Sequence, residues 1–504
     1  MLLSIADSIV LRCFASPERI AIEVVGSDCS LTYGEVWRRI RGLADALAGC
    51  AAGRHGRMVA LLLPNSPDAA LAIAACQIAG VVAVPVNGRL TAPEMRHILA
   101  DADCRLLLTA GSFLGIATEA SRGLPLEVID AATVVTPAVA PRPALGGRDL
   151  GSEPCVVGYT SGTTGFPKGA VYTHDYYTMN NYRWGWAFGL SGDHVVLIAG
   201  PMFHLSYAGF ALAGLTIGAR VRILPEFSAA AALDELDRHC SFAFLVPTML
   251  RMLADEWQQR GCPPLAAARH LISAGAPVTS ELLRTAMRMF PAAKIAEMYG
   301  WTEGALASYE IKDPDKLLAN SVGWPALGAD VALFGEDGEP CAPGVAGEIG
   351  VRGPVPFAGY LGNPEATAAA FHRGYLMSGD IGVFQPDGRL CLVDRKKDVI
   401  ITGGENVYTM EVERVLLEYP AVRECAVVGL PDERWGERIG ALLVVEGPAP
   451  DPAALLAFCR SRLAGYKLPR QIAFASELPR NSMGKVLKAQ VAERLSAAGG
   501  DGRC

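Results

Sequence analysis

The sequence predicts an α/β fold: a large N-terminal domain of layered α/β sheets with a small β-barrel-like subdomain, followed by a small mobile α+β C-terminal domain. Two observations lead to this prediction. Short apolar runs rich in Val, Leu and Ile alternate along the chain with stretches of helical length, which is typical of largely parallel sheets covered by helices. The chain of 504 residues is also too long for one hydrophobic core, so at least two domains are expected.

The alternation begins near residue 58 and returns in the middle of the chain. Strands are expected at Met58–Leu63, Val81–Val86 and Arg105–Thr109, with helices at Asp68–Ile78 and Ala92–Leu99. Further buried strands are expected at Val195–Ile198, Val221–Leu224, Phe242–Val246 and His270–Ser273.

The pattern changes twice in the last third of the chain. Around Ala329–Gly353 short strands are broken by Gly and Pro, which favours a small antiparallel sheet or barrel. After Asp394 a charged stretch, DRKKD, precedes a segment with its own elements. These are a helix at Met410–Tyr419, a strand at Glu424–Gly429 and a helix at Pro452–Leu463. We therefore predict an N-terminal domain, 1–394, a hinge, 395–397, and a C-terminal domain, 398–504.

Composition excludes several classes of function. The formal net charge is −7 with no block of like charge, so nothing indicates nucleic-acid or anionic-membrane binding. The 13 cysteines are scattered and odd in number, which predicts reduced thiols in a cytoplasmic protein. The N-terminus lacks the unbroken apolar stretch of a secretory signal. The most apolar run, Ala69–Val86, is divided by Gln77, Gly80 and Pro85, which predicts a helix, a turn and a strand rather than a membrane span.

A loop rich in Gly, Ser and Thr is the first candidate functional segment. Tyr159–Gly169 reads YTSGTTGFPKG and lies between two β-like segments. Glycines let backbone N–H groups turn toward an anion, because Gly adopts positive φ without strain. Hydroxyl donors and one lysine would add to such a cradle, whereas the spacing and the strand–strand flanks differ from a Walker A loop. From these residues alone, the segment could be a phosphate-binding loop or an ordinary surface loop. The candidate residues are Thr160, Ser161, Gly162, Thr163, Thr164, Gly165 and Lys168.

The full string resembles the signature phosphate loop of the adenylate-forming superfamily, which comprises acyl-CoA synthetases, peptide-synthetase adenylation domains and beetle luciferases. The resemblance runs in order from LTYGEV near Leu31 to NSMGKVLK near the C-terminus, so it covers nearly the whole chain. It implies an enzyme that uses ATP and Mg²⁺ to activate a carboxylic acid as an acyl-adenylate, and then transfers the acyl group to coenzyme A.

The resemblance also implies the nucleotide site. In YGWTE, Tyr299 would pack on adenine, Thr302 would meet the α-phosphate, and Glu303 would hold Mg²⁺ together with Thr160. A flat ring suits a purine, and a carboxylate is a hard-oxygen ligand for Mg²⁺. The other implied contacts are Gly275, Ala276 and Pro277 of SAGAP beside adenine and the acyl group, Asp380 on the ribose, and Arg395 on ribose and phosphate.

Three further assignments concern the two half-reactions. Lys485 in NSMGKVLK resembles the catalytic lysine of adenylation, where a cation between the acid and the phosphate lowers the barrier between two anions. Lys397 matches the hinge about which the family's C-terminal domain rotates. Gly403 and Gly404 match the loop that lines the tunnel for the pantetheine of CoA. Thr409 stands where the family commonly has Pro.

The acid pocket is expected from Phe203–Phe210, Ser273–Pro277 and Met298–Ser308. None of these stretches contains Lys or Arg, and Glu303 is assigned to the metal, so an apolar monocarboxylic acid, fatty or aryl, is predicted. His204 matches a histidine that the family often places beside the bound carboxylate. A neighbouring aromatic cluster would shape this pocket or simply pack in the core: Tyr176, Tyr177, Tyr182, Trp184, Trp186 and Phe188.

The function predicted from the sequence is therefore that of an acyl-CoA synthetase, in keeping with fatty acid metabolism and compatible with a homodimer. One alternative keeps adenylation but passes the acyl group to the phosphopantetheine of a carrier protein. A remote alternative is a non-catalytic sensor of nucleotide or acyl-CoA, which would not need Lys168, Glu303, Asp380, Arg395 and Lys485 together. Hydrolases are excluded because the chain has no G-x-S-x-G elbow and no H-E-x-x-H helix.

Overall fold

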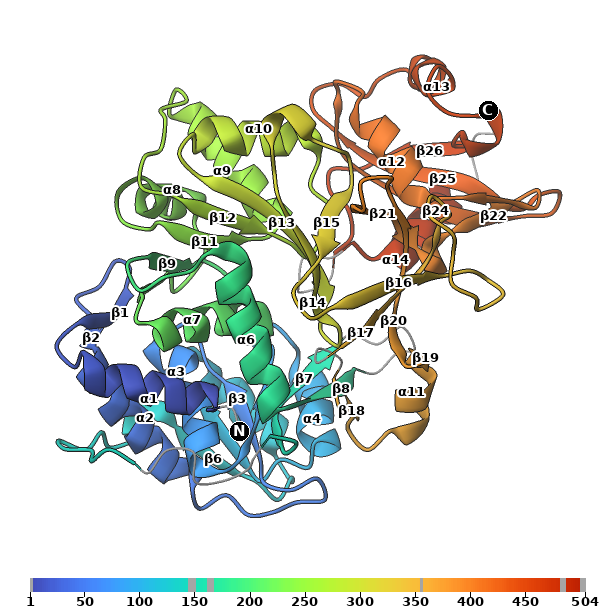
Figure 1. Ribbon diagram of the computed structural model, residues 1–504. Coiled ribbons are helices and arrows are strands. Elements are labelled where there is room, and N and C mark those ends of the chain that lie inside the picture. Colours follow the sequence, from blue (N-terminus) through green and yellow to red (C-terminus); the bar gives the residue numbers. More distant parts are fainter. Residues whose placement is uncertain (1–2, 144–150, 161–166, 354–356, 481–485, 499–504) are drawn as a thin grey trace. The chain divides into compact units, whose positions relative to one another are not determined.

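The computed structural model confirms the α/β class (Figure 1). It describes residues 3–143, 151–160, 167–353, 357–480 and 486–498. The chain forms two compact units. The N-terminal unit comprises Met1–Val331 and Gly350–Met377, and the C-terminal unit comprises Ala332–Ile349 and Ser378–Cys504. The domain division at 394–397 stays a prediction.

One sheet of the N-terminal unit carries the predicted phosphate loop. Its strand order is β18-β8-β7-β4-β3-β5-β6. The four strands β7, β4, β3 and β5 and the edge strand β6 run parallel, whereas β8 is antiparallel to both β7 and β18. The strands are β3 (Met58–Leu62), β4 (Val82–Pro85), β5 (Leu106–Thr109), β6 (Glu127–Asp130), β7 (Pro154–Thr160), β8 (Lys168–Thr173) and β18 (Gly359–Tyr360). The strands and helices predicted for residues 58–109 are confirmed, with α3 at Pro67–Ala79 and α4 at Ala92–Asp101.

The apolar run at residues 69–86 folds as a helix, a turn and a strand, as predicted from the residues that divide it. Ser66 caps α3 by accepting a hydrogen bond from the Ala69 amide, and Pro67 occupies the first turn. Gly80 ends the helix with a left-handed φ of 66°, and β4 follows. Among the described residues, no helix is long and apolar enough to cross a membrane.

A second sheet of the N-terminal unit has the order β15-β14-β13-β12-β11-β9-β10-β1-β2. The strands from β13 to β1 run parallel, and the two ends are antiparallel hairpins. The bounds are β1 (Ile20–Val24), β2 (Ser30–Thr32), β9 (Val195–Ile198), β10 (Arg220–Ile223), β11 (Phe242–Leu245), β12 (His270–Ser273), β13 (Lys294–Trp301), β14 (Ala305–Ile311) and β15 (Ser321–Pro325). The four strands predicted between residues 195 and 273 are therefore confirmed.

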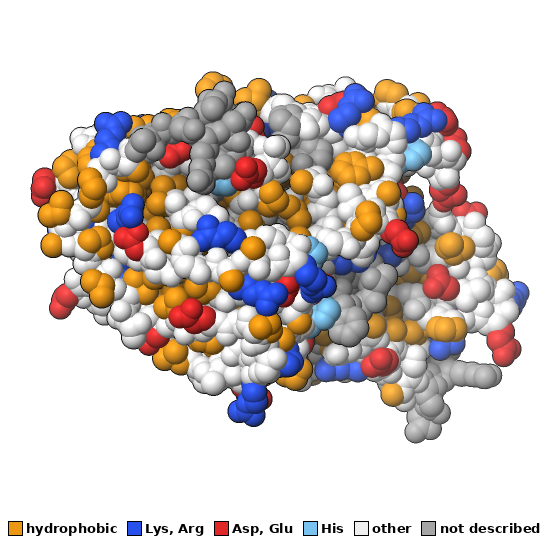
Figure 2. Space-filling view, turned by 90° about the horizontal axis from the view of Figure 1, so that it is seen from below, with side chains coloured by type: hydrophobic (Ala, Val, Ile, Leu, Met, Phe, Trp, Pro, Cys, Tyr) orange, Lys and Arg blue, Asp and Glu red, His pale blue; other side chains and the backbone are white. Residues whose placement is uncertain are grey.

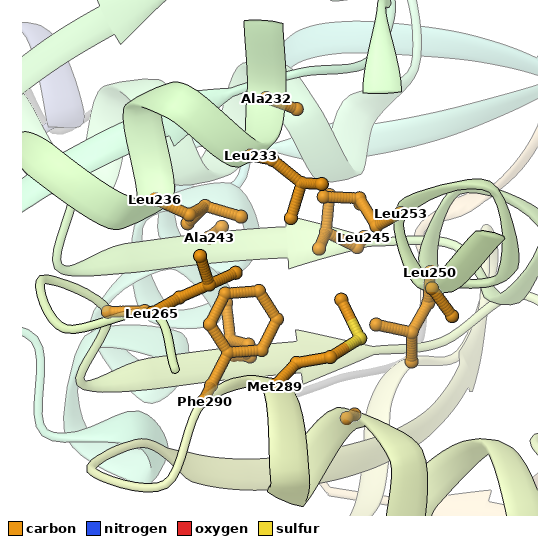
Figure 3. Close-up of a cluster of buried hydrophobic side chains, with 14 of the residues drawn as sticks. Ala232, Leu233, Leu236, Ala243, Leu245, Leu250, Leu253, Leu265, Met289 and Phe290 are labelled. Carbon is orange, nitrogen blue, oxygen red and sulfur yellow. The ribbon is translucent and has the colours of Figure 1, made fainter. Parts of the chain in front are cut away.

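Helices α8 (Ala229–Arg238), α9 (Pro247–Gln259) and α10 (Ser280–Met289) cover one face of this second sheet. Their apolar stripes and the strand side chains form one buried cluster that includes Leu233, Leu253 and Phe290 (Figure 3). Burial of these side chains supplies the hydrophobic stabilisation that fixes β12 and β13, the strands that lead into the SAGAP and YGWTE segments.

The predicted aromatic cluster is mostly core packing between α6 (His174–Phe188) and α7 (Leu205–Ile217). The Trp184 ring stacks on Phe210 with centroids 4.9 Å apart. This approach requires Gly209, because a Cβ there would lie 2.1 Å from Trp184 Cζ3. Trp186 points outward and is 73% exposed. Two helices complete this side of the unit, α1 (Ile5–Ala15) and α2 (Tyr33–Leu47).

The C-terminal unit contains short strands and a helix-covered sheet. The strands β16 (Asp330–Phe334), β17 (Gly347–Arg352), β20 (Tyr375–Phe384) and β21 (Leu390–Arg395) follow one another in that order across their sheet. They belong to this unit except for Asp330–Val331, Gly350–Arg352 and Tyr375–Met377, which belong to the N-terminal unit. A separate sheet has the order β23-β22-β25-β24, with β26 on β25. Its strands are β22 (Ile400–Thr402), β23 (Glu405–Val407), β24 (Val422–Asp432), β25 (Gly436–Val445) and β26 (Gln471–Phe474), and the helices are α12 (Thr409–Leu417), α13 (Pro452–Arg460) and α14 (Lys488–Ala498). The elements predicted after Asp394 are confirmed.

The cysteines that the structure describes are all free thiols. On the face drawn in Figure 2, acidic and basic side chains are interspersed and no large patch of one sign is seen. This mixed surface agrees with the absence of charge blocks in the sequence.

Candidate active site

The predicted phosphate loop joins two antiparallel strands, as its flanks indicated. β7 and β8 pair from Pro154, opposite Thr173, to Thr160, opposite Lys168, with one register shift between Pro154 and Val156. The strand pairing therefore fixes the positions of Thr160 and Lys168. The loop residues between them, Ser161, Gly162, Thr163, Thr164 and Gly165, lie outside the described residues.

The YGWTE segment forms the tip of the β13–β14 hairpin. Tyr299 and Gly300 are at a register shift in the hairpin, and the turn that follows presents Thr302 and Glu303. Glycine is required at position 300, because a Cβ there would lie 1.7 Å from the Ala305 carbonyl oxygen. The predicted adenine-binding ring, Tyr299, is buried, and its centroid lies 5.7 Å from that of Trp301.

The two segments meet within the N-terminal unit. The Thr160 hydroxyl lies 3.3 Å from Glu303 Oε1, and the Tyr360 hydroxyl donates to the same oxygen at 2.8 Å. Lys168 Nζ lies 5.3 Å from the centroid of the Tyr360 ring. Burial, followed by the charge of Glu303, raises the pKa of Tyr360 above its usual value, so the phenol remains a hydrogen-bond donor. The structure thus brings together Thr160, Lys168 and Glu303, and adds Tyr360, which the sequence analysis missed.

Side chains that follow the phosphate loop hold the backbone of the hairpin tip. Tyr172 donates to the Thr302 carbonyl, and Tyr176 donates to the Glu303 carbonyl at 3.2 Å. Further along α6, buried Arg183 donates to the Leu306 carbonyl at 2.8 Å. The first two bonds satisfy carbonyls of the tight turn, and the third reaches a carbonyl of β14. The segment that follows the phosphate loop, β8 and α6, is therefore bonded to the backbone of the YGWTE hairpin.

The residues predicted near the acid lie on the same unit. His204 immediately precedes α7, and Gly275, Ala276 and Pro277 form an exposed turn after β12 in which Gly275 has a φ of 93°. Burial, followed by the nearby charge of Arg89, lowers the pKa of His204 to about 4. The imidazole is therefore neutral at physiological pH, and it can offer a hydrogen bond without a charge.

The C-terminal unit carries the other predicted contacts. Asp380 and Arg395 face each other across β20 and β21, with Oδ1 3.3 Å from Nε. Lys397 lies in the short 3₁₀ turn that follows β21. Gly403 and Gly404, with φ of 61° and 84°, make the turn between β22 and β23. Lys485 lies outside the described residues.

A polar network in the C-terminal unit surrounds the position where the family commonly has Pro. Thr409 Oγ1 donates to Asp394 Oδ1 at 3.0 Å and accepts from Lys488 Nζ at 2.6 Å. The same ammonium lies 3.3 Å from Asp398 Oδ2 and 3.7 Å from Glu413 Oε1. α14 is thereby linked to Asp398 directly and to Asp394 through Thr409, the two residues that flank the predicted hinge. A proline at position 409 could make neither of the Thr409 hydroxyl contacts, so the departure from the family pattern has a structural counterpart.

Comparison with known proteins identifies the family to which this architecture belongs. The model of the AMP-binding enzyme family matches residues 12–361, and that of its C-terminal domain matches residues 411–485. The chain is 38% identical to a feruloyl-CoA synthase from Amycolatopsis sp, over 96% of this chain and 98% of that protein. It is 33% identical to a long-chain-fatty-acid–CoA ligase from Mycobacterium tuberculosis, over 96% and 97%. The structure of o-succinylbenzoate CoA synthetase from Bacillus subtilis with its acyl-adenylate intermediate is similar, with a TM-score of 0.84, 31% identity, and 96% and 97% of the chains covered.

The chain belongs to the AMP-binding enzyme family. It is an enzyme of the AMP-forming acid–thiol ligase class, and the recognition of the adenylate-forming superfamily from the sequence is confirmed.

Proposed function

We propose that this enzyme joins an apolar monocarboxylic acid, fatty or aryl, to coenzyme A through an acyl-adenylate formed from ATP. The observation that carries the proposal is the meeting of a hydroxyl, a lysine and a carboxylate from two distant segments, Thr160, Lys168 and Glu303. A triphosphate needs a cation and hydroxyl donors, and the metal that accompanies it needs a carboxylate. Family membership supports the same assignment.

The nucleotide contacts follow from the chemistry of each side chain. Lys168 would bind phosphate oxygens, and Thr302 would donate a hydrogen bond to the α-phosphate. Asp380 can accept hydrogen bonds from both ribose hydroxyls, while Arg395, whose guanidinium already lies beside it, would contact ribose and phosphate. Tyr299 would supply the flat apolar surface for adenine.

The residues fit a magnesium ion shared with ATP. Glu303 supplies a carboxylate and Thr160 a hydroxyl oxygen 3.3 Å away, and both are hard-oxygen ligands. Among the described residues there is no cluster of three or more His, Cys, Asp or Glu side chains suited to a metal. Mg²⁺ usually binds through one or two carboxylates plus phosphates and water, so one carboxylate is sufficient here. When bound, the ion would neutralise phosphate charge as pyrophosphate leaves.

In the first step a carboxylate oxygen of the acid attacks the α-phosphorus of ATP, and the bond to pyrophosphate breaks. Lys485 would lie between the two anions and stabilise the charge that develops there. In the second step the CoA thiol loses its proton and attacks the acyl carbonyl, and AMP leaves. The paired glycines at 403 and 404, both with positive φ, would let the thin pantetheine arm pass close to the backbone.

The expected acid is apolar because the three stretches assigned to its pocket contain no Lys or Arg to neutralise a second carboxylate. Neutral His204 could donate one hydrogen bond to the reacting carboxylate. The relatives named for feruloyl and for long-chain fatty acids support acids with apolar bodies, whereas o-succinylbenzoate, named in the similar Bacillus subtilis structure, carries a second carboxylate.

The proposal is tested by measuring AMP release from ATP and Mg²⁺ across fatty, aryl and dicarboxylic acids, with and without CoA. We expect CoA-dependent turnover of hexanoate or of aryl acids such as benzoate and ferulate, and little turnover of malonate. Efficient use of malonate alone would contradict the apolar pocket. If the acid supports pyrophosphate exchange but adding CoA does not increase AMP release, a carrier protein would instead be favoured as the acceptor.

A further inference from the structure

Tyr360 lies between a cation and an anion of the proposed ATP site. Its hydroxyl donates to Glu303 Oε1 at 2.8 Å, and the face of its ring lies 5.3 Å from Lys168 Nζ. The backbone of Tyr360 is fixed on both sides. β18 pairs with β8 so that Tyr360 faces Ala170, and the Tyr360 amide donates to Thr367 Oγ1 at 2.9 Å. The ring is therefore held in place by the same hairpin that carries Lys168.

The two charges do not form an ion pair with each other. Lys168 and Glu303 are both described, and they contact the two ends of one tyrosine instead of one another. The tyrosine interacts with the Lys168 ammonium and with the Glu303 carboxylate in different ways. The electron-rich ring face attracts the ammonium, and the acidic hydroxyl proton satisfies the carboxylate oxygen. A small aliphatic side chain could do neither, and the two opposite charges would then be free to approach.

A second tyrosine in the N-terminal unit gives an informative contrast. The Arg352 guanidinium lies 4.5 Å from the centroid of the Tyr375 ring, and the Tyr375 hydroxyl donates to Asp330 at 2.8 Å. Here the cation also reaches the carboxylate directly, with Arg352 Nη2 2.6 Å from Asp330 Oδ2. Around Tyr375 the cation and the carboxylate therefore form an ion pair with each other, whereas Lys168 and Glu303 around Tyr360 do not.

We propose that Tyr360 is a positioning residue that keeps Lys168 and Glu303 from neutralising each other before ATP binds. The lysine then remains available to the phosphates, and the carboxylate remains available to the metal. The inference rests on the proposed function, because that function assigns Lys168 to ATP. It concerns residues of this chain alone, so it can be tested without metal and without turnover.

The experiment measures ATP affinity by titration calorimetry in EDTA, where neither metal nor reaction contributes. We expect Tyr360→Leu to weaken metal-free ATP binding roughly three- to tenfold, because Lys168 would pair with Glu303 in the free protein. Tyr360→Phe keeps the ring under the ammonium and should lose less than Tyr360→Leu. Tyr375→Leu is the matched control and should bind ATP as the wild type does.

Glu303→Gln provides the decisive comparison. Removing a nearby negative charge should strengthen binding of an anion somewhat in any background, so the substitution is made in both the wild type and Tyr360→Leu. We expect the gain to be several-fold larger in Tyr360→Leu, because there it also releases Lys168. Equal gains in the two backgrounds, or wild-type affinity in Tyr360→Leu, would overturn the inference alone. Failure of the folded wild type to bind ATP would overturn the proposed function and the inference with it.

Discussion

A buried ion triad should control the stability of the N-terminal unit, and it is formed by Glu297 of β13, Glu310 of β14 and Lys312, which follows β14. Lys312 Nζ lies 2.6 Å from Glu310 Oε2 and 2.9 Å from Glu297 Oε2, and it donates to the Ser321 carbonyl at 2.6 Å. All three charged side chains are buried, with at most 6% of each residue exposed. The Lys312→Met substitution would leave two carboxylates facing each other without a counter-ion.

The expected cost is about 3–5 kcal/mol at neutral pH, which is typical when one partner of a buried ion pair is removed. The cost should depend on pH. Burial already raises the pKa of Glu297, and loss of the neighbouring ammonium raises it further. A carboxyl whose folded pKa lies above its unfolded pKa stabilises the fold at low pH and loses that contribution as pH rises. The deficit of the variant should therefore be smaller at about pH 5 than at about pH 8.

Urea unfolding followed by tryptophan fluorescence measures this effect, because every tryptophan except Trp435 lies in the N-terminal unit. The triple variant Lys312→Met, Glu297→Gln and Glu310→Gln removes all three charges together and should recover at least half of the lost stability. A loss below about 1 kcal/mol, or a loss equal at both pH values, would refute the reasoning.

Three further predictions concern the proposed chemistry and its surroundings. Lys485→Ala should slow adenylation on the order of a hundredfold, about 3 kcal/mol, and largely spare thioester formation from supplied acyl-adenylate; equal losses in both steps would contradict its role. Gly404→Val should impair the thioester step more than pyrophosphate exchange, because Val crowds the proposed tunnel, and the reverse ranking would contradict that assignment. His204 has a depressed pKa of about 4, so stability should fall as pH drops from 6.5 toward 4. His204→Gln should reduce this decrease in the free energy of unfolding by about 2 kcal/mol, as measured by acid unfolding. If the decrease is unchanged in the variant, groups other than His204 cause it.

Local chemistry explains why most of the fold was predictable. The helix–turn–strand reading of residues 69–86 depended on Gly80, and Gly80 ends α3 with the left-handed φ that only glycine adopts easily. The hairpin around the phosphate loop was predictable for a similar reason, since apolar residues on both sides fit strands. Such signals lie within a few residues of the structure they determine.

The contacts that organise the candidate site were not predictable in this way. Tyr176 and Glu303 are separated by 127 positions in the sequence, and Tyr360 and Glu303 by 57. A single sequence carries no signal for such pairings, and a tyrosine after a glycine reads as an ordinary strand residue. The Thr409 contact with Lys488 was missed similarly, although the departure from Pro at position 409 was visible. The motifs therefore identified the residues of the site, whereas the structure was needed to find what holds them.

In the proposed mechanism an oxygen of the acid becomes bonded to the α-phosphorus of ATP. This step is tested most directly by supplying a turned-over acid labelled with ¹⁸O in its carboxylate, together with ATP, Mg²⁺ and CoA, and analysing the products by mass spectrometry. We expect one labelled oxygen in each AMP and none in pyrophosphate, because thiol attack on the acyl carbonyl leaves on phosphorus the oxygen that came from the acid. Unlabelled AMP, or label in a phosphate released from ATP, would contradict the adenylate pathway.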